Sequence, residues 1–197
     1  DLGTMYPNDL WPWLIKTLEP KTMVDIGCGT GETLRYFDGL KVKAIGIEGL
    51  PWNVARCKER GSQDVILHDF TTGPVKFEPV SLGWCADVIE HIDEKCEENI
   101  FSAFKLCSWL AFCHGTEANA EEGWHHINNK SQKYWVSKLA DIGLVEDEKL
   151  TKESREIGNH GWWEYSGRIY RNTNPSTSSG PTIEGSHRKA EKVEGKE

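Results

Sequence analysis

Apolar residues along the chain fall into short runs that alternate with stretches of helical period. Short apolar runs bounded by Gly, Pro or polar residues are typical of strands in a buried parallel sheet. Apolar positions that recur every three or four residues indicate amphipathic helices between those strands. The pattern predicts strands over 22–26, 43–47, 64–67, 81–85 and 109–113, and helices over 10–18, 32–37, 51–59 and 93–107.

The second part of the chain is less regular. The polar segment 115–130 has neither period, and a loop of that length is usually functional. A helix is expected over 131–142, ending at Gly143. Strands over 145–150 and 162–170 would follow, joined by a glycine-containing loop. Because residues 172–197 are rich in Ser, Thr, Pro, Gly and charges, we expect a disordered tail there and a single domain over 1–171.

Composition narrows the class of protein. The 197 residues carry a formal net charge of −8, which argues against a large non-specific nucleic-acid surface. The longest apolar runs are too short to cross a bilayer. Six cysteines without a C-x-x-C pair suit a reducing, cytoplasmic environment better than a disulfide scaffold. The alternation of strands and helices then predicts a soluble α/β fold with a parallel sheet.

One glycine-rich motif stands directly after the first predicted strand, in the run Val24–Glu32. Glycines there let the chain turn tightly and bring backbone N–H groups close to a ligand. The glycines fall at 27, 29 and 31, whereas a dinucleotide fingerprint would place one at position 32. An NAD-dependent oxidoreductase is therefore disfavoured. Glu48 ends the second strand, where a carboxylate can accept hydrogen bonds from both hydroxyls of a ribose.

This glycine turn, preceded by an acid at Asp25, resembles the cofactor turn of class I S-adenosylmethionine-dependent methyltransferases. The run Trp84–Ile92 resembles the ubiquinone-biosynthesis O-methyltransferase type, whose pattern is Glu-Val-Ile-Glu-His-hydrophobic, with Asp87 replacing the first Glu. The resemblance covers residues 10–171 and is motif-specific over 24–92. It implies an enzyme with a doubly wound, mostly parallel seven-stranded sheet, an antiparallel C-terminal strand and helices on both faces.

The resemblance also implies a site for S-adenosylmethionine. It places Asp25 near the methionyl amine, Asp69 at the adenine amine and Phe70 against the adenine ring. The backbone after the fourth strand would face the methionyl part of the cofactor, because ligands of doubly wound sheets lie beyond the carboxyl ends of the strands. The implied cofactor residues are Asp25, Gly27, Cys28, Gly29, Gly31, Glu48, Gly49, Asp69, Phe70, Cys85 and Ala86.

Three histidines are the candidate catalytic groups. His91 lies in the segment after the fourth strand, and His125 and His126 follow the fifth, near the expected methyl acceptor. Imidazole titrates near neutral pH and can serve as the base that a hydroxyl acceptor needs. A plain surface pair is the alternative interpretation of His125 and His126.

The acids beside His91 allow a second interpretation. Asp87, Glu90 and His91 would share one face of a helical turn, and with His125 or His126 they could hold Mg²⁺ or Mn²⁺. Related acid-acid-His sets hold a divalent ion in some ubiquinone-type enzymes and in small-RNA 3′-terminal 2′-O-methyltransferases. Many relatives use Glu-His only to shape the pocket, so we expect no metal here and keep a divalent metal as the alternative.

These features predict O-methylation of a small or sugar-like metabolite by S-adenosylmethionine. A metal-assisted RNA 2′-O-methyltransferase is the second hypothesis, and the net charge weighs against it. A protein that binds S-adenosylmethionine without catalysis is the third. The identity of the acceptor is not encoded in the motifs, because acceptor loops vary freely on a fixed scaffold.

Overall fold

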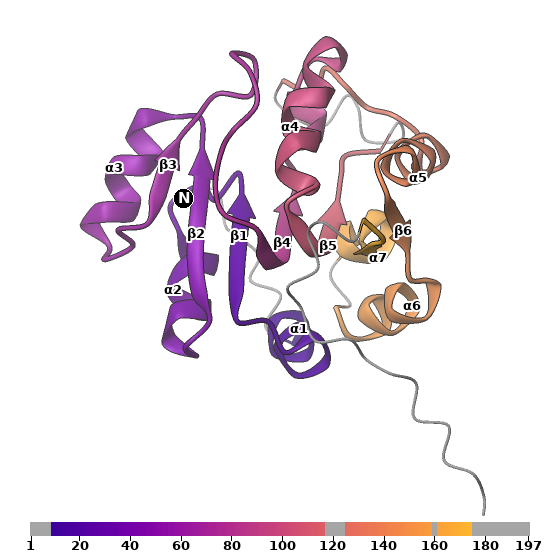
Figure 1. Ribbon diagram of the computed structural model, residues 1–197, viewed down its shortest axis with the longest axis horizontal. Coiled ribbons are helices and arrows are strands. Elements are labelled where there is room, and N and C mark those ends of the chain that lie inside the picture. Colours follow the sequence, from indigo (N-terminus) through magenta and orange to yellow (C-terminus); the bar gives the residue numbers. More distant parts are fainter. Residues whose placement is uncertain (1–8, 117–124, 159–160, 175–197) are drawn as a thin grey trace, which may run out of the picture.

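The computed structural model describes residues 9–116, 125–158 and 161–174. One seven-stranded sheet in the order β3-β2-β1-β4-β5-β7-β6 forms its centre (Figure 1). Every strand runs parallel to its neighbours except β7, which is antiparallel to both β5 and β6. The strands are β1 (Thr22–Ile26), β2 (Lys43–Glu48), β3 (Val65–Leu67), β4 (Val80–Ala86), β5 (Cys107–Cys113), β6 (Leu144–Glu146) and β7 (Arg168–Asn172). The expected doubly wound fold is confirmed.

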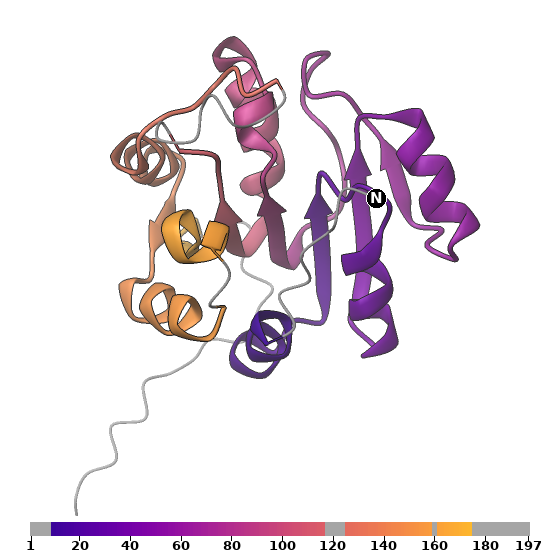
Figure 2. The same cartoon turned by 180° about the vertical axis from the view of Figure 1, so that it is seen from behind.

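Helices cover both faces of this sheet (Figures 1 and 2). One face packs against α4 (Glu97–Phe104) and α5 (Gln132–Asp141). The opposite face packs against α1 (Leu10–Leu18), α2 (Glu32–Gly39), α3 (Pro51–Glu59), α6 (Glu148–Ile157) and α7 (Gly161–Ser166). Short 3-10 turns, η1 (Ile89–His91) and η2 (Glu94–Cys96), connect β4 to α4. None of the helices in the described ranges is long and apolar enough to cross a membrane.

Alternation along the strands sorts the apolar residues between two cores. Successive side chains of a strand point to opposite faces, so Val24 joins the α4–α5 core while Met23 joins the core under α1 and α2. In β4, Cys85 and Trp84 divide in the same way. Trp84 stacks on Trp163 of α7, with ring centroids 5.2 Å apart and planes 11° apart. Both faces of the sheet therefore pack against an apolar core, as expected for a largely parallel sheet.

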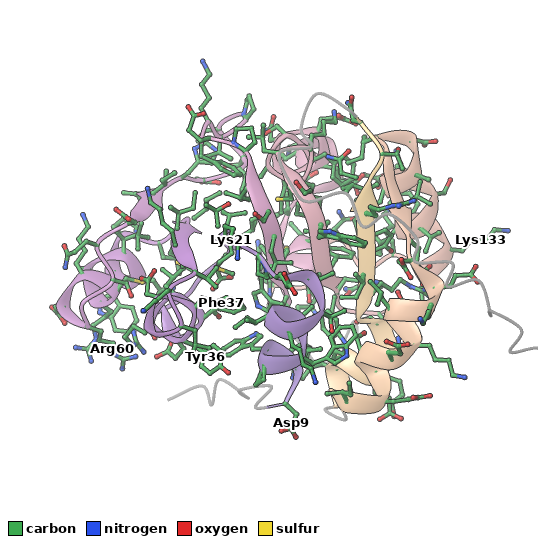
Figure 3. The ribbon with its side chains drawn as sticks, turned by 60° about the horizontal axis from the view of Figure 1, so that its bottom comes forward. Asp9, Lys21, Tyr36, Phe37, Arg60 and Lys133 are labelled. Carbon is green, nitrogen blue, oxygen red and sulfur yellow. The ribbon has the colours of Figure 1, made fainter. Side chains whose placement is uncertain are left out.

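The two edges of the sheet differ in what they carry. Figure 3 brings the amino edge forward. There the rings of Tyr36 and Phe37, both in α2, contact the ring of Trp11 in α1. The carboxyl edge, at the top of Figure 1, holds the turns that follow β1, β2 and β4. The strand order reverses between β1 and β4, and ligands of doubly wound sheets bind at such a switch point.

Three predicted boundaries are wrong. The strand expected over 145–150 ends at Glu146, because Asp147 caps a helix there by accepting a hydrogen bond from the Leu150 amide. The strand expected over 162–170 starts only at Arg168, after the helical turn α7. The helix expected over 93–107 is shorter, since η2 precedes it and β5 already begins at Cys107.

The domain extends slightly beyond the expected boundary at residue 171. Asn172 is the last residue of β7, and its side-chain amide donates to the carbonyl oxygens of Lys105 and Cys107 at 3.0 Å each. Residue 172 thus belongs to β7, and the tail expected over 172–197 stays a prediction. Its residues 175–197, like the part 117–124 of the expected loop, lie outside the described residues.

Candidate functional site

The glycine turn after β1 requires left-handed backbone at three positions. Gly27, Gly29 and Gly31 have φ values of +80°, +53° and +81°. A Cβ on Gly27 would lie 2.3 Å from Cγ2 of Val88, and one on Gly31 would lie 3.0 Å from Sγ of Cys57. At Gly29, by contrast, no atom lies within 4 Å of such a Cβ. The backbone of Gly29 thus borders open space, as a turn that receives a ligand should.

The N–H groups of this turn already have acceptors inside the protein. Gly27 and Cys28 both donate to the carbonyl of Ile47, at 2.8 and 3.1 Å, and Gly29 donates to Oε2 of Glu48 at 2.9 Å. The turn is thereby fixed to the end of β2. At these three positions the amides are engaged within the protein, and a ligand there would meet a close backbone surface.

Glu48 occupies the end of β2, beside the turn. Its side chain is buried, and Oε1 accepts a second hydrogen bond from the amide of Leu50 at 2.9 Å. A carboxylate has about four acceptor positions, so two remain for other donors. Leu50 and Leu67, at the ends of β2 and β3, are 60% and 52% exposed. An acid beside exposed apolar side chains fits a ribose attached to a flat base.

Asp25 lies beneath the turn and is almost completely buried. Burial, more than the nearby Glu48 and Glu32 carboxylates, raises its pKa to about 7 from 3.8, while the Thr33 hydroxyl lowers it. A raised pKa of this kind is common at functional sites. The side chain interacts with the Thr33 hydroxyl inside the fold. Its burial does not favour direct contact with a methionyl amine.

The two residues expected at the adenine take different positions. Asp69 is exposed, and its Oδ1 accepts a hydrogen bond from the Thr71 amide at 2.8 Å, which holds its pKa below the usual range. Phe70 is buried in the core on the α4 side, and its carbonyl accepts from Asn99 at 2.7 Å. Asp69 therefore borders solvent near the end of β3, whereas the Phe70 ring packs inside the fold.

The remaining expected cofactor residues contribute backbone or packing. Cys85 is fully buried and Ala86 partly buried at the end of β4. The Cys28 thiol points inward, where a Cβ on Gly46 would lie 2.6 Å from its Sγ. Gly49 follows Glu48 directly. All six cysteines are buried and free.

A second cluster lies beyond β4 and β5. It consists of Glu90, His91 and His126. Each offers one atom that could bind a metal ion, and these three atoms lie within 4.8 Å of one another. The rings of the two histidines meet edge to face, with centroids 4.9 Å apart. Oε1 of Glu90 accepts from the Gly115 amide at 2.7 Å, but Oε2 of Glu90 and Nδ1 of His126 are buried without a hydrogen-bond partner. Buried polar atoms without partners are rare, and an ion or ligand is one explanation for them.

The protonation states in this cluster are shifted. Burial, and then the Asp87 carboxylate, raises the pKa of Glu90 to about 7. Burial also lowers the pKa of His91, so this imidazole is neutral at pH 7. Nδ1 of His91 lies 3.3 Å from the carbonyl oxygen of His125, which can only accept a hydrogen bond. Nδ1 therefore carries the hydrogen, and Nε2 is left as the basic nitrogen.

The structure changes the expected metal set in two places. The segment after β4 is a 3-10 turn, and Asp87 precedes it with a left-handed φ of +53°. The Asp87 carboxylate accepts a hydrogen bond from the Cys113 thiol at 3.8 Å, while the ligand atoms that gather within 4.8 Å are those of Glu90, His91 and His126. His125 is exposed and has a φ of +61°, and His126 stands in its place in the cluster. Strained backbone of this kind gathers at functional sites.

Two buried polar residues near the cluster were not anticipated. Glu97 is 3% exposed, and Asn128 is 2% exposed. The spacing of Glu97 to the buried Ile100, Phe101 and Phe104 is three, four and seven residues, which places it on the apolar face. That spacing is the signal that could have revealed Glu97. Asn128 stands in a segment without any period and gives no such signal.

Residues 24–107 match the family model described as a methyltransferase domain. This stretch runs from β1 through the glycine turn, Glu48 and Glu90 to the start of β5. The match indicates a methyltransferase domain over these residues, in agreement with the doubly wound sheet. The chain is thus an enzyme whose cofactor is S-adenosylmethionine. No curated protein matches the sequence significantly.

Solved structures agree with the methyltransferase fold. A SAM-dependent methyltransferase from Archaeoglobus fulgidus is 15% identical, with a TM-score of 0.57 over 84% of this chain and 92% of the other. Magnesium protoporphyrin IX methyltransferase from Synechocystis, crystallised with bound SAH, is 15% identical, with a TM-score of 0.59 over 83% and 80%. The methyltransferase domain of bacterial CtHen1-CN is 16% identical, with a TM-score of 0.60 over 87% and 100%. At such identities the likeness concerns the fold.

Proposed function

We propose that this methyltransferase transfers the methyl group of S-adenosylmethionine to a hydroxyl oxygen of a small or sugar-like acceptor. The observation that carries this proposal is the cluster of Glu90, His91 and His126 at the same edge of the sheet as Gly29 and Glu48. A hydroxyl is a poor nucleophile at neutral pH and needs a group that removes or stabilises its proton.

The protein's own contribution is to orient and to handle one proton. The sulfonium of the cofactor is already an activated donor, so the chain mainly aligns an in-line displacement. Glu48 and the exposed face of Gly29 would hold the adenosyl part. Where no cation is bound, Nε2 of His91 is the nitrogen free to accept the hydroxyl proton, because Nδ1 is bound to the His125 carbonyl.

The same cluster fits a divalent cation. One carboxylate and two imidazoles, two of them with a buried atom that lacks a partner, form a donor set for Mn²⁺ or a similar ion. Glu90, His91 and His126 would hold it, with His126 in place of the expected His125. When bound, such a cation acts as a Lewis acid that lowers the pKa of a hydroxyl.

The test combines binding and turnover with a matched pair of variants. Transfer of a labelled methyl group would be measured to a panel of sugars, sugar nucleotides and a short RNA, with and without chelator. We expect methylation of a small hydroxylated acceptor, loss on chelation and recovery with Mn²⁺. His126→Ala should remove Mn²⁺ binding, and the neighbouring His125→Ala should retain it.

The other outcomes separate the alternatives. Binding of S-adenosylhomocysteine without methylation of any acceptor would support the non-catalytic hypothesis. Methylation of the RNA alone would favour the second hypothesis. Activity that survives chelation would refute the cation, and His91 would then be the base, with His91→Ala lowering kcat more than cofactor affinity.

A further inference from the structure

The segment that carries His126 is held by contacts unrelated to regular secondary structure. Its two following amides, those of Ile127 and Asn128, both donate to the carbonyl oxygen of Glu90, at 2.9 and 3.0 Å. The side-chain amide of Asn129 donates to the His126 carbonyl at 3.0 Å. These contacts align the segment along η1. A second contact, from the Asn128 side chain, ties the segment to α4.

That second anchor is Glu97, a buried carboxylate at the first turn of α4. Its Oε1 accepts from Nδ2 of Asn128 and its Oε2 from the hydroxyl of Tyr134, each at 2.9 Å. Within the described ranges, no Lys, Arg or His forms an ion pair with it. The amino end of α4 and these two hydrogen bonds stabilise the buried carboxylate, and loss of one donor would leave an oxygen without a partner.

Asn128 combines both anchors in one residue. Its backbone amide donates to the carbonyl oxygen of Glu90, a residue of the cluster. Its side-chain amide donates to the carboxylate of Glu97, which lies seven residues after Glu90 in the sequence. His126 lies only two residues before Asn128. Fixing Asn128 at both its backbone and its side chain leaves His126 little freedom relative to Glu90 and His91.

We propose that Glu97 and Asn128 are positioning residues, which hold His126 against Glu90 and His91 and so set the affinity of the cluster for a divalent cation. This inference rests on the proposed function, in which that cluster binds the cation. Residues that orient metal ligands from the next shell typically change metal affinity by about 10- to 100-fold when they are replaced. Tyr134 shares Glu97 but contacts neither His126 nor its segment through that bond, so it serves as the control.

The experiment measures Mn²⁺ affinity by calorimetry and the Mn²⁺ EPR spectrum in the full chain. Asn128→Asp keeps the size of the side chain but brings two carboxylates together. It should weaken Mn²⁺ binding by about 10-fold or more. The double variant Glu97→Gln/Asn128→Asp exchanges the acid and the amide, restores a hydrogen bond between them, and should return the affinity to within about 3-fold of the wild type. Tyr134→Phe should also stay within about 3-fold, since the bond to Asn128 survives.

The affinity for S-adenosylhomocysteine, measured on the same samples, reports whether each variant folds. Should Asn128→Asp fail to fold, the exchanged pair decides alone. A folded exchanged pair that binds Mn²⁺ as weakly as Asn128→Asp would overturn the positioning role, and so would wild-type affinity in a folded Asn128→Asp. Wild-type protein that binds S-adenosylhomocysteine but no Mn²⁺ would instead refute the cation site of the proposed function, and this inference with it.

Discussion

Replacing Gly29 by Ala tests directly where the cofactor lies. Gly29 has a φ of +53°, and no atom lies within 4 Å of an added Cβ. The methyl group therefore meets no neighbour in the ligand-free protein. An L-residue in left-handed backbone costs about 1–2 kcal/mol, of which the lower entropy of the unfolded chain returns about 0.4–1 kcal/mol. We expect a net loss of about 1 kcal/mol in the free energy of unfolding.

Cofactor binding should suffer far more than stability. If the adenosyl part lies against the Gly29 backbone, the new methyl group occupies its space, and overpacking of this kind costs about 1–3 kcal/mol. The dissociation constant for S-adenosylhomocysteine should then rise by about 5- to 150-fold in calorimetry. Urea unfolding of the same samples gives the stability.

Gly61→Ala is the matched control for this change. Gly61 has a φ of +97° and equally open surroundings, but it lies in the turn after α3. It should lose at least as much stability as Gly29→Ala and bind S-adenosylhomocysteine like the wild type. Equal cofactor affinity in Gly29→Ala and in the wild type would refute the placement of the cofactor at this turn.

Three further predictions concern the same region. Glu48→Gln leaves one acceptor oxygen for two backbone amides and the ribose, so calorimetry should show S-adenosylhomocysteine binding weakened by about 2–4 kcal/mol. Glu32→Gln, on the same turn, should bind S-adenosylhomocysteine like the wild type, and equal loss in both variants would point to a damaged turn instead. Gly27→Ala forces its Cβ against Val88 and should cost about 2–4 kcal/mol of stability in urea unfolding, and adding Val88→Ala should recover part of this, whereas simple additivity would contradict the clash. Because burial raises the pKa of Asp25 to about 7 from 3.8, the native state binds this proton more tightly than the unfolded chain does. Asp25 therefore lowers stability as pH rises from about 4 to 7, by up to about 4 kcal/mol, and Asp25→Asn should flatten that part of the profile; parallel profiles would show that Asp25 ionises normally.

The strands formed by short apolar runs could be predicted from the sequence. β1, β2 and β4 stand where the runs predict them, and the residues directly after them reach one edge because parallel strands end together. The positions of the glycine turn and of Glu48 follow from this rule alone. What the turn does with its amides could not be predicted, since the acceptor of Gly27 and Cys28 is the carbonyl of Ile47 on another strand.

The helix α6 was missed for a different reason. The buried face of α6 is made by Thr151 and Ser154, which are small and polar and so do not register in an apolar period. Their hydroxyls are satisfied by partners distant in sequence: Thr151 accepts from the Ile169 amide and Ser154 from the indole of Trp163. Burial of these hydroxyls depends on contacts that no local pattern contains.

The choice between His125 and His126 shows most clearly where sequence reasoning ends. Within a helix or a strand, spacing determines which side chains share a face. A single residue in left-handed backbone breaks that rule, and one such residue stands on each side of the cluster, Asp87 before η1 and His125 before His126. The expected set assumed helical spacing for Asp87 and left the two histidines as substitutes for each other. The ligand atoms that lie together are those of Glu90, His91 and His126, and between two such backbone positions no periodic pattern can supply the direction of these side chains.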